Sequence, residues 1–291
     1  MGPVAALIQG GRLHLQHGPI DLVIGAEGQG RSPDAARQLA FRAARDRFAT
    51  ILEDLVAELP LLRQPLGDLP QGIVARRMQH ACKVVQQGDF ITPMAAVAGA
   101  VADEVLATMV VAVPLARAYV NNGGDIALYL ACDQSYRAAI AGLDGHVSGH
   151  VTICAGDGIG GIATSGQGGR SLSLGIAGSV TVLAANAAQA DAAATLIANA
   201  VDLPGHPAIA RKPAIEVWPD SDLGPRPVVV GIGQLPPDDI ALALSRGAAR
   251  ARALQSTGAI VAAALVLQGQ GVTVGEFHRA TALPSRSLQH A

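Results

Sequence analysis

The order in which helical and strand patterns follow one another limits the possible folds of this chain more than any other feature. Residues 33–59 and 93–109 have the apolar spacing of helices, whereas residues 118–185 form short apolar segments separated by glycines, as strands do. Helical patterns then return. Because the two patterns do not alternate regularly, as they do in parallel βαβ folds, we predict an α+β layered fold with antiparallel or mixed sheets and packed helices.

Local signals place the ends of several elements. An alternating pattern on both sides of residues 17–19 predicts a β-hairpin at the start of the chain. Ser32 and Thr92 each precede a proline and have the position of a helix N-cap. Pro60 is expected to end the first long helix, and Asn186 to cap an alanine-rich one.

Glycine-bounded apolar runs predict further strands. The segments "SLSLG" at residues 171–175 and "SVTVLAA" at residues 179–185 both have this form. A final hairpin is predicted to turn at residues 269–271 and to close the fold.

Length and composition bound the domain organisation. A chain of 291 residues can form one domain, 1–291, or two closely packed subdomains of about 1–115 and 116–280. Half of the residues are hydrophobic, but only 15% are charged and 3% aromatic, so small side chains dominate the core and let elements pack closely. The alanine-rich surfaces are also compatible with a homodimer.

Charge and targeting signals argue against two classes of partner. The net charge is -2 and no Lys/Arg cluster has aromatic neighbours, so we expect no nucleic-acid partner. The N-terminus lacks a signal-peptide pattern, and the longest apolar run, residues 259–267, is about half of what a membrane-spanning helix needs. Three widely spaced cysteines, Cys82, Cys132 and Cys154, indicate reduced thiols. We therefore predict a cytoplasmic protein without membrane association.

Two motif-like segments do not support the chemistry that they first suggest. Residues 156–161 match G-x-G-x-x-G, but no helix pattern follows and no acid lies between Asp157 and Asp191 to bind a ribose. We therefore exclude a dinucleotide-binding fold. His146 and His150 are four residues apart, but the glycines beside them predict turns, so we interpret them as ordinary loop or strand histidines.

Asp191 is the most informative polar residue. It projects from a helix built otherwise of alanine and leucine, and Thr195 lies one turn further on the same face. If that face is buried, an unpaired carboxylate is costly unless a cation or a cluster of backbone N–H donors lies beside it. Carboxylate and hydroxyl oxygens are ligands suited to Mg²⁺. The alternative is a solvent-facing aspartate on an amphipathic helix.

Two further segments are rich in groups that bind ligands through the backbone. In "ATSGQGGRSLSLG", residues 163–175, hydroxyls and glycines accompany Arg170, and such a loop can hold a phosphate or the edge of a heterocycle. In "NNGGD", Asn122 and Asp125 flank two glycines that let the main chain approach a ligand closely. A plain hairpin turn explains the glycines of both segments equally well.

The order of these segments resembles the ApbE-like superfamily, the flavin transferases that attach FMN from FAD to proteins. The segments "NNGGDI", "IATSG" and "QADAAAT" carry the resemblance. The chain is more similar still to the ApbE-like branch called UPF0280, whose "GPMAAVAGA" resembles residues 92–100 and whose "NGGDI" and "ADAAAT" match residues 122–126 and 190–195. The similarity extends from the N-terminal hairpin to about residue 201.

The resemblance implies an ApbE-like fold, a flavin or FAD ligand and a protein acceptor. It implies that Asp191 and Thr195 bind Mg²⁺. Arg170 would add positive charge beside a pyrophosphate leaving group, and Asp103 would act as a base or metal ligand unless it forms a core salt bridge. The residues expected to line the ligand cleft are Thr92, Met94, Asn122, Gly123, Gly124, Asp125, Thr164, Ser165, Gly166, Ser171 and Ser173.

The sequence departs from both patterns. The UPF0280 branch is expected to have an acidic residue shortly after the S-x-S-x-G run and a histidine before it, where this chain has "GIAGS" at residues 175–179 and Arg170. Another departure is from the flavin transferases. Their pattern K-G-x-x-x-D aligns with residues 98–103, where Asp103 is kept but Ala98 replaces the lysine. Three functions therefore remain open at this stage. The chain is a transferase of a flavin or nucleotidyl group, a non-catalytic accessory protein that binds a flavin or other cofactor, or a biosynthetic enzyme acting on a pterin- or furan-type cofactor.

Overall fold

A nine-stranded sheet is the framework of the computed structural model, which describes residues 2–141, 147–169 and 171–276. The strand order is β1-β2-β3-β4-β5-β8-β9-β12-β13, and every neighbouring pair is antiparallel. The hairpin β6–β7 and the antiparallel pair β10–β11 form two smaller sheets. The strands are β1 (Val4–Ile8), β2 (Arg12–His17), β3 (Ile20–Gly28), β4 (Leu115–Asn122), β5 (Asp125–Leu130), β6 (Ser135–Ala141), β7 (Val147–Cys154), β8 (Gly161–Ser165), β9 (Ser179–Ala184), β10 (Ile209–Pro213), β11 (Pro227–Ile232), β12 (Ala262–Leu267) and β13 (Gln270–Val274).

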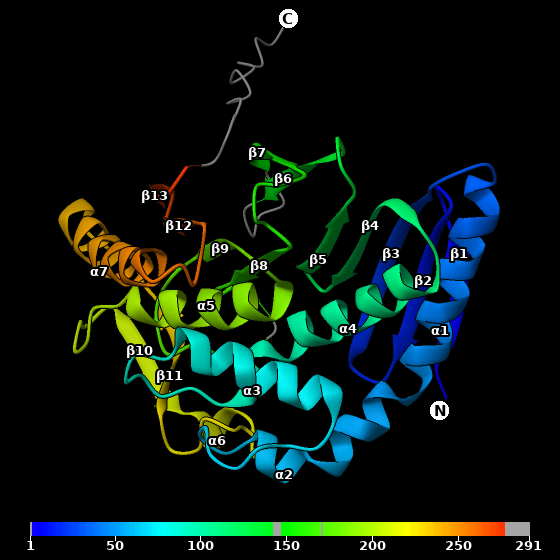
Figure 1. Ribbon diagram of the computed structural model, residues 1–291. Helices are drawn as coiled ribbons and strands as arrows, with labels where there is room; N and C mark the ends of the chain where they lie inside the picture. The colour runs from blue at the N-terminus through cyan, green and yellow to red at the C-terminus, as the bar shows by residue number, and fades with distance from the viewer. Residues whose placement is uncertain (1, 142–146, 170, 277–291) are drawn as a thin grey trace, which may run out of the picture.

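The helices pack against the sheet and against one another, which confirms the predicted α+β class (Figure 1). In particular, α3, α4 and α5 are in mutual contact, and α1 packs on α4. The helices are α1 (Pro33–Ala57), α2 (Leu59–Leu62), α3 (Ile73–Val85), α4 (Val97–Ala112), α5 (Ala187–Ala200), α6 (Ala214–Val217) and α7 (Pro237–Ser256), and a 3₁₀ helix, η1 (Pro93–Ala96), leads into α4.

The predicted helix ends are partly confirmed. The side chain of Asn186 accepts a hydrogen bond from the Gln189 amide at 2.8 Å and caps α5 as predicted. Ser32 and Thr92 occupy N-cap positions, but their side chains make no capping hydrogen bond. The prediction for Pro60 was wrong in detail, because α1 ends before it and Pro60 lies in the first turn of α2, where a missing N–H group costs nothing.

The opening hairpin and the strand β9 are confirmed. The closing hairpin is present, but it turns at residues 268–269 and not at 269–271 as predicted. The strand predicted at residues 171–175 is wrong. The hydroxyl of the buried Ser173 lies 3.1 Å from the Gly175 carbonyl oxygen. A Cβ atom on Gly175 would lie 2.1 Å from the Ala198 carbonyl oxygen, so this segment packs directly on α5 instead of joining a sheet. The strands β6 and β10 were not predicted.

Hydrophobic side chains form clusters on both faces of the large sheet. The larger cluster lies between the sheet and the helices and includes Val120 and Ala163. The smaller cluster lies between the opposite face and the β6–β7 hairpin, and includes Ile153, Ile162 and Leu183. Successive residues of a strand face opposite sides of a sheet, so each strand residue can be assigned to the helix side or to the hairpin side.

Among the described residues, one helical segment, Pro93–Ala112, is long and apolar enough by composition to cross a membrane, with a mean hydropathy of 1.7. Half of that segment is buried inside the protein. It packs against α1, α3 and α5 (Figure 1), which favours a core helix over a membrane span.

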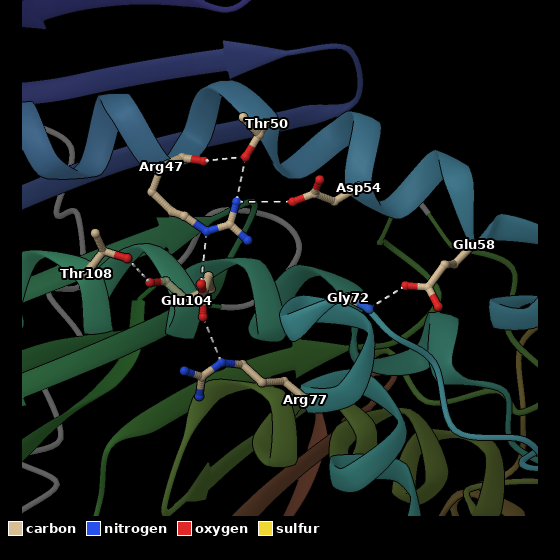
Figure 2. A network of polar contacts seen from close by, with 8 residues as sticks. All are labelled: Arg47, Thr50, Asp54, Glu58, Gly72, Arg77, Glu104 and Thr108. Atoms are coloured by element: carbon tan, nitrogen blue, oxygen red, sulfur yellow. Dashed lines mark hydrogen bonds and ion pairs between the residues drawn. The ribbon is translucent and has the colours of Figure 1, made fainter.

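A polar network joins α1, α3 and α4 within this helical layer (Figure 2). The carboxylate of Glu104 in α4 is 6% exposed and accepts hydrogen bonds from Arg47 Nε of α1 at 2.9 Å and from Arg77 Nε of α3 at 3.1 Å. Arg47 also pairs with Asp54, at 3.2 Å. The network fixes α4 relative to two neighbouring helices.

Candidate functional site

Backbone contact joins α4 and α5 near their first turns. A Cβ atom on Gly99 of α4 would lie 2.3 Å from the Ala187 carbonyl oxygen and 2.7 Å from the Ala188 amide nitrogen. Only glycine permits an approach this close. The crossing places side chains of each helix beside the start of the other.

Each of these helices supplies an aspartate to the start of the other. Asp103 of α4 accepts hydrogen bonds from the amides of Ala187 at 3.0 Å and Ala188 at 2.8 Å. Asp191 of α5 accepts one from the Gly99 amide at 3.0 Å. First-turn N–H groups lack partners within their own helix, and a negative charge beside them is favourable. The two acids therefore cap α4 and α5 reciprocally.

Three carboxylates influence one another at this crossing: Asp103, Asp125 and Asp191. The pKa of Asp191 is raised well above its usual range, first by burial and second by the nearby Asp125, although backbone N–H groups of α4 lower it. The pKa of Asp103 rises to about 6, because burial outweighs its two backbone hydrogen bonds and the charge of Arg77. The site thus brings together carboxyl groups whose ionised form is disfavoured, and a nearby cation would favour it.

The raised pKa of Asp103 predicts that the free energy of unfolding falls as the pH rises from about 4 to about 6. The folded protein keeps the Asp103 proton until about pH 6, whereas the unfolded chain releases it near 3.8. Between these values the folded state binds more protons, so stability decreases with pH, by about 2 kcal/mol over the window. The free energies of unfolding of the wild type and of Asp103→Asn are measured with urea at several pH values. The difference between the two proteins should change by this amount across the window. A difference that is independent of pH would contradict the prediction.

The turn between β4 and β5 is built on glycines with positive φ, +66° at Gly123 and +114° at Gly124. Both values lie in the region that glycine adopts without steric cost. The Gly124 amide donates a hydrogen bond to Asn121 Oδ1 at 2.9 Å, which fixes the turn.

This turn connects the start of α4 with β8. Asn122 Nδ2 donates to the Ala98 carbonyl oxygen at 3.1 Å, and the Thr164 amide donates to Asp125 Oδ1 at 3.3 Å. Asp125 in turn lies close enough to Asp191 to raise its pKa. The predicted β4–β5 turn therefore contacts β8 through Asp125, which also lies near Asp191 of α5.

The residues of the predicted T-S-G segment lie on different sides of the sheet. The Thr164 hydroxyl is on the hairpin side, 2.9 Å from the Thr181 hydroxyl, whereas the Ser165 side chain is on the helix side. Gly166 follows the strand, and a Cβ atom there would lie 2.4 Å from the Gly178 carbonyl oxygen. Thr164 thus reaches the carboxylate cluster through its backbone amide.

The remaining predicted ligand residues are more dispersed. Ser171 is exposed, and the hydroxyl of Ser173 is bonded within its own loop. Met94 is partly buried and packs against the main core. Arg170 lies outside the described residues.

Two residues beside Thr92 were not found from the sequence. The buried Thr92 hydroxyl donates to the carboxylate of Asp222, and the Cys82 thiol donates to the Thr92 carbonyl oxygen at 3.3 Å. Burial, followed by the charge of Asp191, raises the pKa of Cys82. Asp222 is 130 residues from Thr92, so no local pattern indicates this contact. Cys82 is buried and all three cysteines are free thiols.

The described residues contain no group of three or more His, Cys, Asp or Glu arranged to hold a metal ion. Mg²⁺ does not need such a group, because it keeps several waters and takes one or two carboxylates. Asp191 and Thr195 are partly buried, one turn apart on α5, with Asp125 nearby, and these oxygen donors fit Mg²⁺. His146 lies outside the described residues, and His150 lies in β7.

Comparison with known proteins gives relatives at the level of sequence and of fold. The chain is 38% identical over 166 residues to a "UPF0280 protein" of Methanothrix thermoacetophila, an alignment that covers 52% of this chain. The chain spans 64% of the length of that relative.

Similar solved structures include two flavin transferases. Flavinyl transferase ApbE of Pseudomonas stutzeri shares 13% identity with a TM-score of 0.44, over 94% of this chain and 93% of the other. A point mutant of flavin transferase ApbE of Vibrio cholerae shares 15% identity with a TM-score of 0.47, over 94% and 97%.

The family is settled by a broader match. The model of the family described as "AbpE bacteria" matches residues 4–274, which span the whole nine-stranded sheet and all the helices described above. The resemblance found in the sequence motifs is thereby confirmed, and the chain belongs to this ApbE-like family.

Proposed function

We propose that this protein binds a flavin or another nucleotide-type ligand together with Mg²⁺ and transfers a flavin or nucleotidyl group. The observation that carries the proposal is the placement of Asp191. Its partly buried carboxylate lies near Asp125, its pKa is raised, and Thr195 follows one turn later. A divalent cation would remove the cost of bringing these carboxylates together.

Within this proposal the chain's own residues bind and orient the ligand. Asp191 and Thr195 would hold Mg²⁺, which when bound neutralises the charge of a pyrophosphate group. Asn122 and Asp125 would form the wall next to α4, and Ser165 the wall next to α5. Backbone N–H groups near the start of α4 would give further donors to an anionic ligand.

The site combines both halves of the sequence. Gly99 and Asp103 come from the first 115 residues, whereas Asp125 and Asp191 come from the rest, and the four meet at one helix crossing. This supports our proposal that residues 1–291 act as a single domain. A cytoplasmic location and a protein acceptor complete the proposal.

The second candidate is binding without transfer, and the residue at position 98 favours it. Ala98 stands where the flavin transferases have a lysine, so its side chain has no amine to act as a base or a cation. Its carbonyl oxygen accepts a hydrogen bond from the side-chain amide of Asn122. A protein of this kind would keep the ligand cleft and lack the chemistry.

Release of AMP from FAD separates the two candidates. Purified protein is incubated with FAD and Mg²⁺, with and without EDTA, and AMP is measured by chromatography. AMP leaves when the pyrophosphate bond of FAD breaks and the FMN group passes to water or to an acceptor hydroxyl. Mg²⁺-dependent release supports transfer, and binding of FAD without release, to water or to an added acceptor, supports the accessory role. Covalent flavin on a protein acceptor is then sought by fluorescence on a denaturing gel.

Asp191→Ala tests the site assignment. We expect this variant to lose the Mg²⁺-dependent rise in melting temperature and any AMP release, because the principal metal ligand is gone. Asp238→Ala is the matched control, since that aspartate is exposed at the start of α7. Thermal shifts with flavins and with pterins identify the ligand class. If Asp191→Ala keeps every ligand and metal response, the assignment is wrong.

A further inference from the structure

The strand β1 forms one edge of the nine-stranded sheet, and its composition is unusual for an edge. All five of its residues are apolar; four are exposed and the fifth is partly exposed. Val4 is 56% exposed and Leu7 is 74% exposed. Edge strands normally carry charges, prolines or bulges that prevent pairing with another strand. Within β1 there is none of these, and its register with β2 is unbroken.

A cavity lies beside this strand on the helix side of the sheet. It has a volume of about 220 Å³ and an apolar lining that includes Ala5, Leu15 and Phe48. Ala5 and Leu7 project to this side, because they pair in register with Leu15 and Leu13, which are both buried under the helices. The small side chain of Ala5 leaves space, while the large side chain of Leu7 is exposed two positions further along.

We propose that β1 pairs antiparallel with β1 of a second copy of this chain, about a two-fold axis at Ala6. In an antiparallel ladder the N–H and C=O groups of successive residues point to alternate edges of the strand. The backbone groups of two opposed residues must therefore either both point toward the other strand or both point away from it. For two copies of one strand, this restricts the pairs to residues whose numbers differ by an even amount. Centring on Ala6 uses the full strand and places the partner subunit's Leu7 opposite Ala5.

This register makes the surface complementary to itself. The partner subunit's Leu7 would lie beside Ala5 and fill the cavity there, and the symmetry repeats the contact. Arg45 and Asp46 lie at the rim of the cavity, 58% and 61% exposed, and pair with each other at 3.2 Å. Each copy thus presents one positive and one negative side chain to the partner subunit. A five-residue edge with this rim is smaller than a standard interface of about 1,600 Å², so the dimer is expected to be reversible.

Sedimentation velocity over a dilution series tests the pairing. The wild type is expected to shift from monomer to dimer with concentration, and Leu7→Lys to raise the dissociation constant by about tenfold or more. Val111→Lys is the matched control, because Val111 is 88% exposed on α4 and outside the strand. A wild type that is monomeric throughout, or a dimer that Leu7→Lys does not weaken, overturns the proposal.

Disulfide trapping tests the register and does not depend on the folding of Leu7→Lys. In a background with Cys132→Ser and Cys154→Ser, which removes the exposed thiols, Ala6→Cys places two thiols opposite each other across the axis. Opposed Cα atoms in a ladder are about 4.5–5.5 Å apart, within the range of a disulfide. Mild oxidation should give a covalent dimer with Ala6→Cys and much less with Ala5→Cys. Equal or absent cross-linking in both variants overturns the proposed register.

Discussion

Replacement of Glu104 by alanine is expected to lower the free energy of unfolding by about 3 kcal/mol. The Glu104 carboxylate lies between the guanidinium groups of Arg47 and Arg77 (Figure 2). Its removal would leave two positive charges facing each other without their common partner. Loss of one member of a fully buried ion pair costs about 3–5 kcal/mol. The lower value applies because the Arg77 side chain is 40% exposed and can turn to water.

Urea unfolding measures this loss, and an exposed ion pair provides the control. Asp46→Ala removes the partner of Arg45 on the surface of α1, where an ion pair contributes less than about 1 kcal/mol. Alanine is a good helix former, so neither substitution is penalised by helix propensity. If both variants lose the same small amount, the network in Figure 2 contributes no more than a surface pair.

The sequence predicts those parts of the fold that depend on neighbours along the chain. The Asn186 cap can be predicted from the sequence because its hydrogen bond reaches only three residues along the chain, to Gln189. The opening hairpin is readable because alternation and a turn specify it locally. The segment at residues 171–175 has the same local appearance as a strand, but the contact of Gly175 with α5 decides its conformation. Such a contact leaves no local pattern.

The candidate site shows the same division. The sequence singles out Asp191 as an acid that needs either a cation or backbone donors, and the Gly99 amide supplies a backbone donor from 92 residues away. Asp103 was expected to be a base, a metal ligand or part of a salt bridge. It caps α5, and the core salt bridge is made by the neighbouring Glu104, whereas the role of Asp103 as a base or metal ligand stays a prediction. The sequence shows that an acid projects from a helix, but the crossing of two helices determines which groups that acid binds.

That crossing predicts the largest effect of a single substitution. Gly99→Ala is expected to lower the free energy of unfolding by about 4 kcal/mol, because overpacking adds to the loss of the aspartate caps on two helices. Alanine would by itself stabilise a helix by about 1 kcal/mol relative to glycine. The new Cβ atom, however, would lie 2.3 Å from the Ala187 carbonyl oxygen. The helices would have to separate, which would break the hydrogen bonds of Asp103 and Asp191.

Gly247→Ala distinguishes this backbone contact from ordinary overpacking. Gly247 is also a helical glycine, in α7, and its Cβ atom would lie 2.3 Å from a methyl group of Val201 and 2.7 Å from one of Leu265, both of them side-chain atoms. A side chain can turn away, whereas the backbone at Ala187 can move only with α5 itself. We therefore expect Gly247→Ala to cost clearly less in urea unfolding, and only Gly99→Ala to weaken the response to Mg²⁺ as well. Equal losses in both variants would mean that disturbing the backbone contact costs no more than overpacking against side chains, and a rigid crossing could then not be what holds Asp191 in place.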